Sequence, residues 1–116
     1  MESRRILYLG TSKDDLGEFP HEVQEGVLYA LEVARLGGKA SSAIPLNGFG
    51  VTQVFEIKEP FDGDTYRAVY LARFRDALYV LHAFQKKSKS GKAIPRLDRE
   101  MIERRLKLAL RDAGRS

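Results

Sequence analysis

Apolar residues recur along the chain with the spacing of a strand in some stretches and of a helix in others. Arg5 to Leu9 (RILYL) is a short apolar run that favours a β-strand. After Pro20, small and aliphatic residues recur every three or four positions, which predicts a helix ending near Gly37–Gly38. The buried face of that helix is expected to carry Val23, Val27, Ala30, Leu31 and Ala34.

Polar residues mark where helices are expected to begin. Ser12 followed by Asp15 resembles a capping box and predicts a short helical turn. Pro20 stands where the first residue of a helix would be, since its missing N–H costs nothing there. Asp98 can cap a last helix beyond Pro95. On that helix one face is expected to carry Ile102, Leu106, Ala109 and Ala113.

The middle of the chain has the pattern of a loop followed by three strands. Residues 39–50 are rich in Ser, Pro and Gly and predict a loop, and strands are expected at about 52–58, 65–74 and 77–84. Asp62–Gly63 is a strong two-residue hairpin signal, and Arg75–Asp76 is a second candidate turn. The order of elements predicts one α+β domain over residues 1–116, with helices packed on a mainly antiparallel sheet.

The two turns also predict which side chains share a face of the sheet. With Asp62–Gly63 as loop residues, Lys58 opposes Arg67; with Arg75–Asp76 as loop residues, Val69 opposes His82. One face then carries Glu56, Lys58, Arg67, His82, Phe84 and Lys86, with Val69, Leu71, Leu78 and Val80 at its apolar end. The other face, the expected seat of the helices, carries Phe55, Ile57, Tyr66, Ala68, Tyr70, Tyr79, Leu81 and Ala83.

Charge is distributed unevenly around a formal net charge of +4. Residues 1–50 hold five Lys and Arg against seven Asp and Glu, whereas residues 51–116 hold fifteen against nine. A basic half points weakly to nucleic acid or another acidic partner. The stretch after the last strand is either a solvated loop or a rim that contacts RNA phosphates through Lys87, Lys89, Lys92 and Arg96.

Several kinds of chemistry are excluded or disfavoured by residue type. The chain has no cysteine, which excludes thiolate zinc sites and cysteine nucleophiles, and its two histidines lie in different predicted elements, so no metal site is expected. No phosphate-binding glycine loop or nucleophile elbow is present. The N-terminal apolar run is too short for a signal peptide or membrane span, and we expect a cytoplasmic protein.

The cationic face is suited to cleavage of RNA without a metal ion, because RNA supplies its own nucleophile, the 2′-hydroxyl. Arg67 could clamp the phosphate with two hydrogen bonds. Lys58 and Lys86 could act as base, acid or charge stabiliser. His82 is either a second proton-transfer group or a packed structural histidine. The alternative for the whole cluster is that its long side chains simply extend into water.

Three segments carry a resemblance to a known family. "FDGDTYRAVY", then "LYVLHAFQKKS", then Pro95 and a basic helix resemble the HigB/RelE superfamily of bacterial and phage toxins, and in particular its phage-derived HigB-like branch. The segments "DLGEFP" and "PLNGFG" are similar to that branch too. The resemblance implies a small RelE-like α+β fold and the toxin of a type II toxin–antitoxin system. It also implies a metal-independent mRNA endoribonuclease without cofactor, often acting on the ribosome, and a helix-turn-helix antitoxin (HigA-like) as partner.

The resemblance also implies roles for individual residues. Arg67 occupies the family's arginine after the hairpin turn, Lys58 a strand position that is basic in RelE-type toxins, and Lys86 or Lys87 the basic position ending the last strand. Glu56 stands where RelE-type toxins tend to be basic. The C-terminal tyrosine or histidine of some relatives has no counterpart beyond Tyr79 and His82, so the identity of the base stays open.

Two other readings of the same sequence remain. One is a ParE-like toxin that inhibits DNA gyrase and has no nuclease activity. The other is a catalytically degenerate phage-derived module whose basic loop binds an acidic antitoxin. The cluster of Lys58, Arg67 and Lys86 favours the nuclease, because an inhibitor that binds only protein has no need of phosphate-binding cations on one face.

Overall fold

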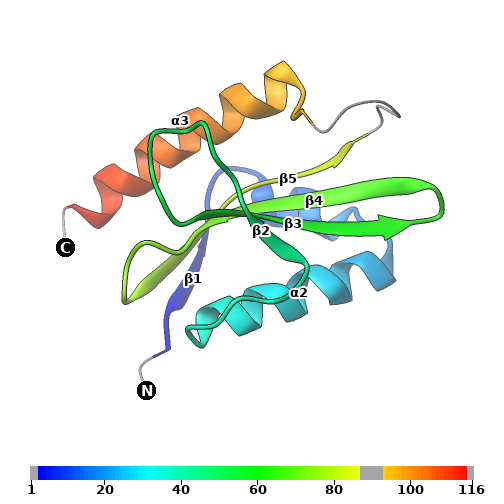
Figure 1. The fold of residues 1–116 in the computed structure, drawn as a ribbon, viewed down its shortest axis with the longest axis horizontal. Coiled ribbons are helices and arrows are strands. Elements are labelled where there is room, and N and C mark those ends of the chain that lie inside the picture. Colours follow the sequence, from blue (N-terminus) through cyan, green and yellow to red (C-terminus); the bar gives the residue numbers. More distant parts are fainter. Residues whose placement is uncertain (1–2, 87–92, 115–116) are drawn as a thin grey trace.

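The computed structural model describes residues 3–86 and 93–114. Their strands form one mixed sheet in the order β1-β5-β4-β3-β2, with β1 parallel to β5 and the other neighbours antiparallel (Figure 1). The strands are β1 (Arg5–Tyr8), β2 (Ala43–Pro45), β3 (Val54–Phe61), β4 (Asp64–Leu71) and β5 (Ala77–Lys86). The predicted α+β class is therefore confirmed.

Helices cover both faces of this sheet. α1 (Ser12–Gly17) and α2 (His21–Arg35) follow β1, and α3 (Arg96–Ala113) ends the described chain. α2 lies on one face and α3 on the other, as the ribbon view shows (Figure 1). The prediction that the helices share a single face is wrong, because apolar residues on the charged face form a second core cluster with α3.

Each helix buries its own apolar cluster against the sheet. The face of α2 that is buried consists of the residues predicted from their spacing, Val23, Val27, Ala30, Leu31 and Ala34. On α3 the buried face contains Ile102, Leu106 and Ala109 as predicted, and in addition the charged residue Arg105. Burial of apolar area of this kind is the main stabilising contribution to a domain of 116 residues.

The β3–β4 hairpin has the predicted turn and register. Asp62 and Gly63 both have positive φ angles, +51° and +86°, as the two central residues of a type I′ turn require. Phe61 therefore pairs with Asp64, and Lys58 pairs with Arg67. Because side chains of directly opposed residues point to the same face, this turn brings the two cations together.

The β4–β5 pair follows its predicted register for only part of its length. Val69 opposes His82 as predicted, but the register shifts by one residue beyond this pair, and Tyr70 opposes Val80. The connection is also longer than the predicted Arg75–Asp76 turn, since residues 72–76 lie outside the strands. A slip of one residue exchanges the faces. Leu78 and Val80 thus pack on the α2 side, and Tyr79 and Leu81 on the α3 side, opposite to the prediction.

Three further predictions about local structure are corrected. Residues 39–50 contain the edge strand β2 as well as a loop. α1 is preceded by Thr11, whose hydroxyl donates to Asp15 over 2.8 Å, while the Ser12 hydroxyl donates to a buried carbonyl instead of capping. Pro20 and Pro95 are the N-cap residues of α2 and α3, so Asp98 lies inside the first turn of α3 and does not cap it.

Candidate active site

The charged residues of three neighbouring strands meet on the α3 side of the sheet. Glu56 and Lys58 alternate along β3, Arg67 opposes Lys58 on β4, and Lys86 ends β5 opposite Thr65. The structure thus brings together three of the predicted site residues, Lys58, Arg67 and Lys86. We call these three residues, with Glu56, the β3–β5 charge cluster.

A buried ion pair lies at the centre of the cluster. Arg67 is 6% exposed and Glu56 2% exposed, and Nη1 of Arg67 donates to Oε2 of Glu56 over 2.7 Å. Nζ of Lys58 lies 4.0 Å from the other carboxylate oxygen, and its side chain is 35% exposed. The cluster is therefore built around a buried pair and reaches solvent at Lys58.

The Arg67 guanidinium is only partly used by the described residues. Its Nε is buried and has no hydrogen-bond partner among them. A buried donor without a partner is costly, and such groups in native proteins commonly mark a water or ligand position. Arginine commonly binds phosphate and carboxylate groups through the edge that carries Nε.

The pKa of the Lys86 side chain is lowered by its surroundings. Its pKa is lowered, first by the loss of solvation on burial and then by the neighbouring charges of Arg67 and Lys58, against which Glu56 acts in the opposite direction. A lysine with a lowered pKa gives up its proton more readily than an exposed one.

His82 lies next to this cluster but makes its hydrogen bonds elsewhere. Its Nε2 is 2.8 Å from Oδ1 of Asp98, and its Nδ1 is 3.3 Å from Nη1 of Arg105. Arg105 in turn donates to the Leu81 carbonyl and to the Thr11 hydroxyl. These contacts tie β5 to α3 and fit the structural interpretation of His82, whose ring also stacks on Phe84 with a centroid distance of 5.0 Å.

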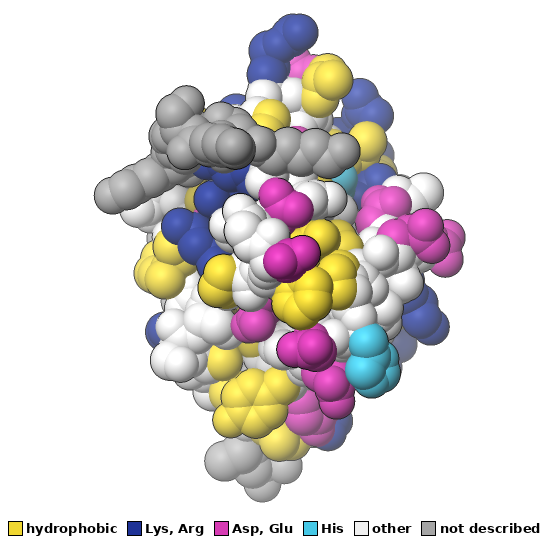
Figure 2. All heavy atoms as spheres, turned by 90° about the vertical axis from the view of Figure 1, so that its right-hand side faces the viewer, with side chains coloured by type: hydrophobic (Ala, Val, Ile, Leu, Met, Phe, Trp, Pro, Cys, Tyr) yellow, Lys and Arg dark blue, Asp and Glu magenta, His cyan; other side chains and the backbone are white. Residues whose placement is uncertain are grey.

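The predicted RNA-contacting residues fall mostly outside the described part of the chain. Lys87, Lys89 and Lys92 lie outside the described residues. Arg96 begins α3, is exposed, and lies 3.7 Å from Glu100. At the hairpin end of the molecule, Lys and Arg side chains occupy part of the surface and acidic side chains lie near its centre (Figure 2).

Two buried charged residues of the α3 side were missed or undervalued by sequence reasoning. Glu56 was placed on the cationic face, two residues before Lys58, but no role was assigned to it. Arg105 stands three residues after Ile102 on the apolar face of α3, and that spacing could have indicated a buried arginine. Both are charged residues at positions where the pattern calls for apolar ones.

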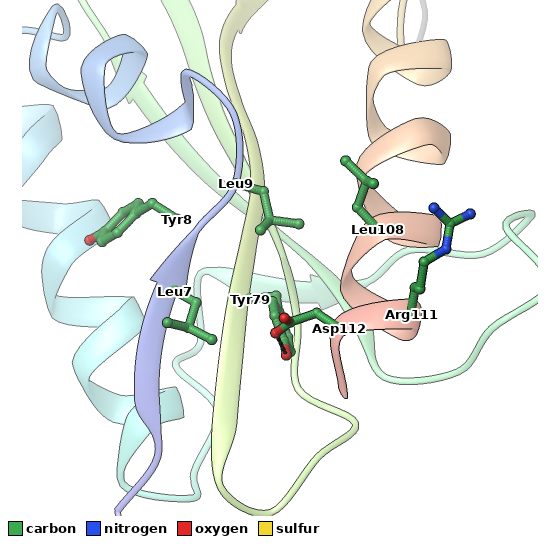
Figure 3. Close-up of a pocket in the computed structure, with 7 residues that line it drawn as sticks. All are labelled: Leu7, Tyr8, Leu9, Tyr79, Leu108, Arg111 and Asp112. Carbon is green, nitrogen blue, oxygen red and sulfur yellow. Dashed lines mark hydrogen bonds between the residues drawn. The ribbon is translucent and has the colours of Figure 1, made fainter. Parts of the chain in front are cut away.

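A cavity of about 450 Å³ lies elsewhere, between β1 and α3 (Figure 3). Leu7 of β1, Leu9 just after β1 and Leu108 of α3 point into it, while the Tyr79 hydroxyl donates to Asp112 over 2.6 Å. Burial, followed by this bond, raises the pKa of Tyr79 to about 12. The cavity shares no residue with the β3–β5 charge cluster, and we place the candidate active site at the cluster because it carries the cations.

The small α+β fold, with a mixed sheet between helices, is consistent with a RelE-like domain. The family model of phage-derived Gp49-like proteins (DUF891) matches residues 14–107, and the chain belongs to this family, which is associated with RelE/HigB-like toxins. A search among curated proteins gave no match. Within the described residues, no helix has the length and apolarity needed to cross a membrane.

Proposed function

We propose that this protein is the toxin of a type II toxin–antitoxin system and that it cleaves mRNA, on the ribosome, without a metal ion. The observation that carries the proposal is the buried guanidinium of Arg67, with an unpartnered Nε, next to Lys58 and Lys86. Such a group of cations fits a phosphodiester better than a protein surface. The membership of a toxin-associated family supports the same conclusion.

In the proposed reaction the RNA 2′-hydroxyl attacks the neighbouring phosphorus and leaves a cyclic phosphate and a free 5′-hydroxyl. Arg67 and Lys58 bind the non-bridging oxygens, on which negative charge grows toward the transition state. Lys86, with its lowered pKa, supplies a proton to the departing 5′-oxygen.

Replacement of Arg67 tests the proposal. Because Arg67→Ala would leave the Glu56 carboxylate buried without a partner, Arg67→Gln and Arg67→Lys are better probes. We expect both variants to lower the rate of mRNA cleavage by about 100-fold or more. Gln lacks the positive charge, and Lys keeps the charge but cannot form a bidentate contact with phosphate. Cleavage is measured by primer extension on ribosome-bound mRNA, with chelator present, and growth arrest is measured on induction in cells.

Arg73→Gln serves as the matched control, because it removes the same charge from an exposed position just beyond β4. It should cleave like the unmodified protein. Full cleavage by both Arg67 variants would show that the site is elsewhere. Inhibition of DNA gyrase by a protein that cleaves no RNA would favour the ParE-like alternative. Relief of growth arrest by a small helix-turn-helix protein, encoded by the gene next to that of this protein, would identify the antitoxin.

A further inference from the structure

The segment between β2 and β3, residues 46–53, makes a contact with α3 that the proposed reaction does not use. The central carbon of the Arg99 guanidinium lies over the Phe49 ring, 4.7 Å from its centroid, where the segment reaches α3 (Figure 1). Gly48, whose φ of +95° favours glycine, turns the segment beside the same guanidinium, since a Cβ there would lie 3.4 Å from Nη2 of Arg99. The guanidinium is therefore held in one place against an aromatic ring.

The polar groups of Arg99 are not used within the described part of the chain. Arg99 is partly exposed, and its side chain makes no hydrogen bond or ion pair with a described residue, although Glu103 follows one turn later on α3. A contact that only closed residues 46–53 onto α3 would need no charge, because a leucine or methionine would also pack on Phe49. The donors of Arg99, and the face of its guanidinium away from Phe49, are thus without a partner among the described residues.

Arg99 lies beside the β3–β5 charge cluster. The preceding residue of α3, Asp98, contacts His82 of β5 over 2.8 Å, and His82 stands opposite Val69 of β4. On the same face, the next residue pair along the β3–β4 hairpin contains Lys58, the partly exposed cation of the cluster, about 7 Å further along the strands. Because a sugar separates each base from its phosphate, an RNA with a phosphate at Lys58 can place a neighbouring base at Arg99.

We infer that Arg99, held on Phe49, is a stacking platform for one base of the RNA next to the cut, an inference that rests on the proposed function. A guanidinium is planar and stacks on aromatic rings, so a nucleobase can cover one face while Phe49 covers the other. Stacking of this kind tolerates different sequences, because every base has a π-face. Arg99 thus positions the RNA by one of its bases and takes no part in proton transfer.

Removal of single bases from the RNA tests the inference. The substrates are ribosome-bound mRNAs that carry an abasic nucleotide at one of the positions flanking the bond cut by the unmodified protein. At limiting protein concentration, we expect the unmodified protein to cleave one of these mRNAs about 10-fold more slowly than the intact mRNA, as the loss of one stacked base predicts. Equal cleavage of every abasic mRNA overturns the inference, while the proposed function stands.

Two substitutions remove the platform from the protein. Arg99→Lys keeps the charge and loses the planar face, and Phe49→Leu keeps an apolar side chain and loses the ring. Each variant should cleave the intact mRNA about 10-fold more slowly, and the sensitive abasic mRNA at nearly the same rate as the intact one. Arg104→Lys, from the exposed face of α3, is the matched control and should keep the full abasic penalty. Retention of that penalty by Arg99→Lys, or its loss in Arg104→Lys, overturns the inference.

Base fluorescence gives a readout that does not depend on cleavage. The probe is the same mRNA with 2-aminopurine, whose fluorescence is quenched by stacking, at the sensitive position, and with a 2′-deoxynucleotide at the cut, which removes the nucleophile. At saturating concentration, the unmodified protein and Arg104→Lys should quench the fluorescence, and Arg99→Lys should not. Equal quenching by Arg99→Lys overturns the inference even if Phe49→Leu fails to fold. If the unmodified protein cleaves no mRNA at all, the proposed function itself fails.

Discussion

The buried charges of the α3 side form two groups with different surroundings. Glu56 of β3 and Arg67 of β4 form an ion pair beside the partly exposed Lys58. His82 and Arg105 lie between β5 and α3, with Asp98 at the start of the helix. In the first group, Arg67 Nε has no partner among the described residues and Lys58 is partly exposed, which suits chemistry. The second group satisfies hydrogen bonds across an internal interface, which suits stability.

His82→Asn is expected to destabilise the protein more than it impairs the reaction. The change removes the contact to Asp98 and leaves polar groups of the β5–α3 interface unsatisfied, at a cost of about 1–3 kcal/mol in the free energy of unfolding. Urea denaturation measures this, and the cleavage rate of the remaining folded protein should fall far less than in Arg67→Gln. His21→Asn is the control, since His21 is highly exposed and only weakly paired with Glu25.

The opposite result would be equally informative. If His82→Asn unfolds at the same urea concentration as the unmodified protein but loses cleavage, His82 takes part in proton transfer. That outcome would support the sequence-based prediction of a catalytic histidine over the structural interpretation.

At the scale of elements, local signals in the sequence were sufficient where a turn alone decides the pairing. Asp62–Gly63 predicts a hairpin with a defined register, and from it follows the pairing of Lys58 with Arg67. The β4–β5 pair has a longer connection and a register shift after Val69, and neither has a strong sequence signal. The face assignments of Leu78 to Leu81 therefore failed. Those of His82 and Lys86 were correct because the register shift between Val69 and Tyr70 offsets the one-residue error in the predicted turn.

The hairpin turn gives a prediction at the same scale. Gly63→Ala should destabilise the protein by about 1 kcal/mol, because Gly63 has a φ of +86° that a Cβ disfavours even though the surrounding space is open. Gly17→Ala is the matched control, since Gly17 also has open space around it but no positive φ, and it ends α1. Its free energy of unfolding should stay equal or rise slightly. Thermal denaturation of the two variants compares them directly; equal losses would mean that the turn conformation is not what matters.

At the scale of the whole molecule, the site joins parts of the chain that the sequence pattern could place and parts that it could not. Lys58, Arg67 and Lys86 were placed together from strand alternation and two turns. The edge strand β2, which sets Ile44 beside Glu56, has only three residues and lies in a segment rich in Ser, Pro and Gly. The burial of Glu56 depends on packing from several elements, and no local pattern reports that.

Charge asymmetry gives the last prediction. The described cluster and the basic residues after β5 belong to the half of the chain that carries the excess of Lys and Arg. If Lys89 and Lys92 contact RNA phosphates, Lys89→Ala and Lys92→Ala should each reduce the salt dependence of binding, measured as the slope of log affinity against log salt concentration. Each contact with a phosphate of single-stranded RNA contributes about 0.7 to this slope, so loss of one contact lowers the slope by that amount.

Lys13→Ala, from the acidic half, controls for the change in net charge and should leave the slope unaltered. An unchanged slope for both the Lys89 and the Lys92 variant would confine RNA contact to the β3–β5 charge cluster, where Arg67 and Lys58 are fixed by the sheet. Binding by so few contacts would then depend on the ribosome to present the mRNA.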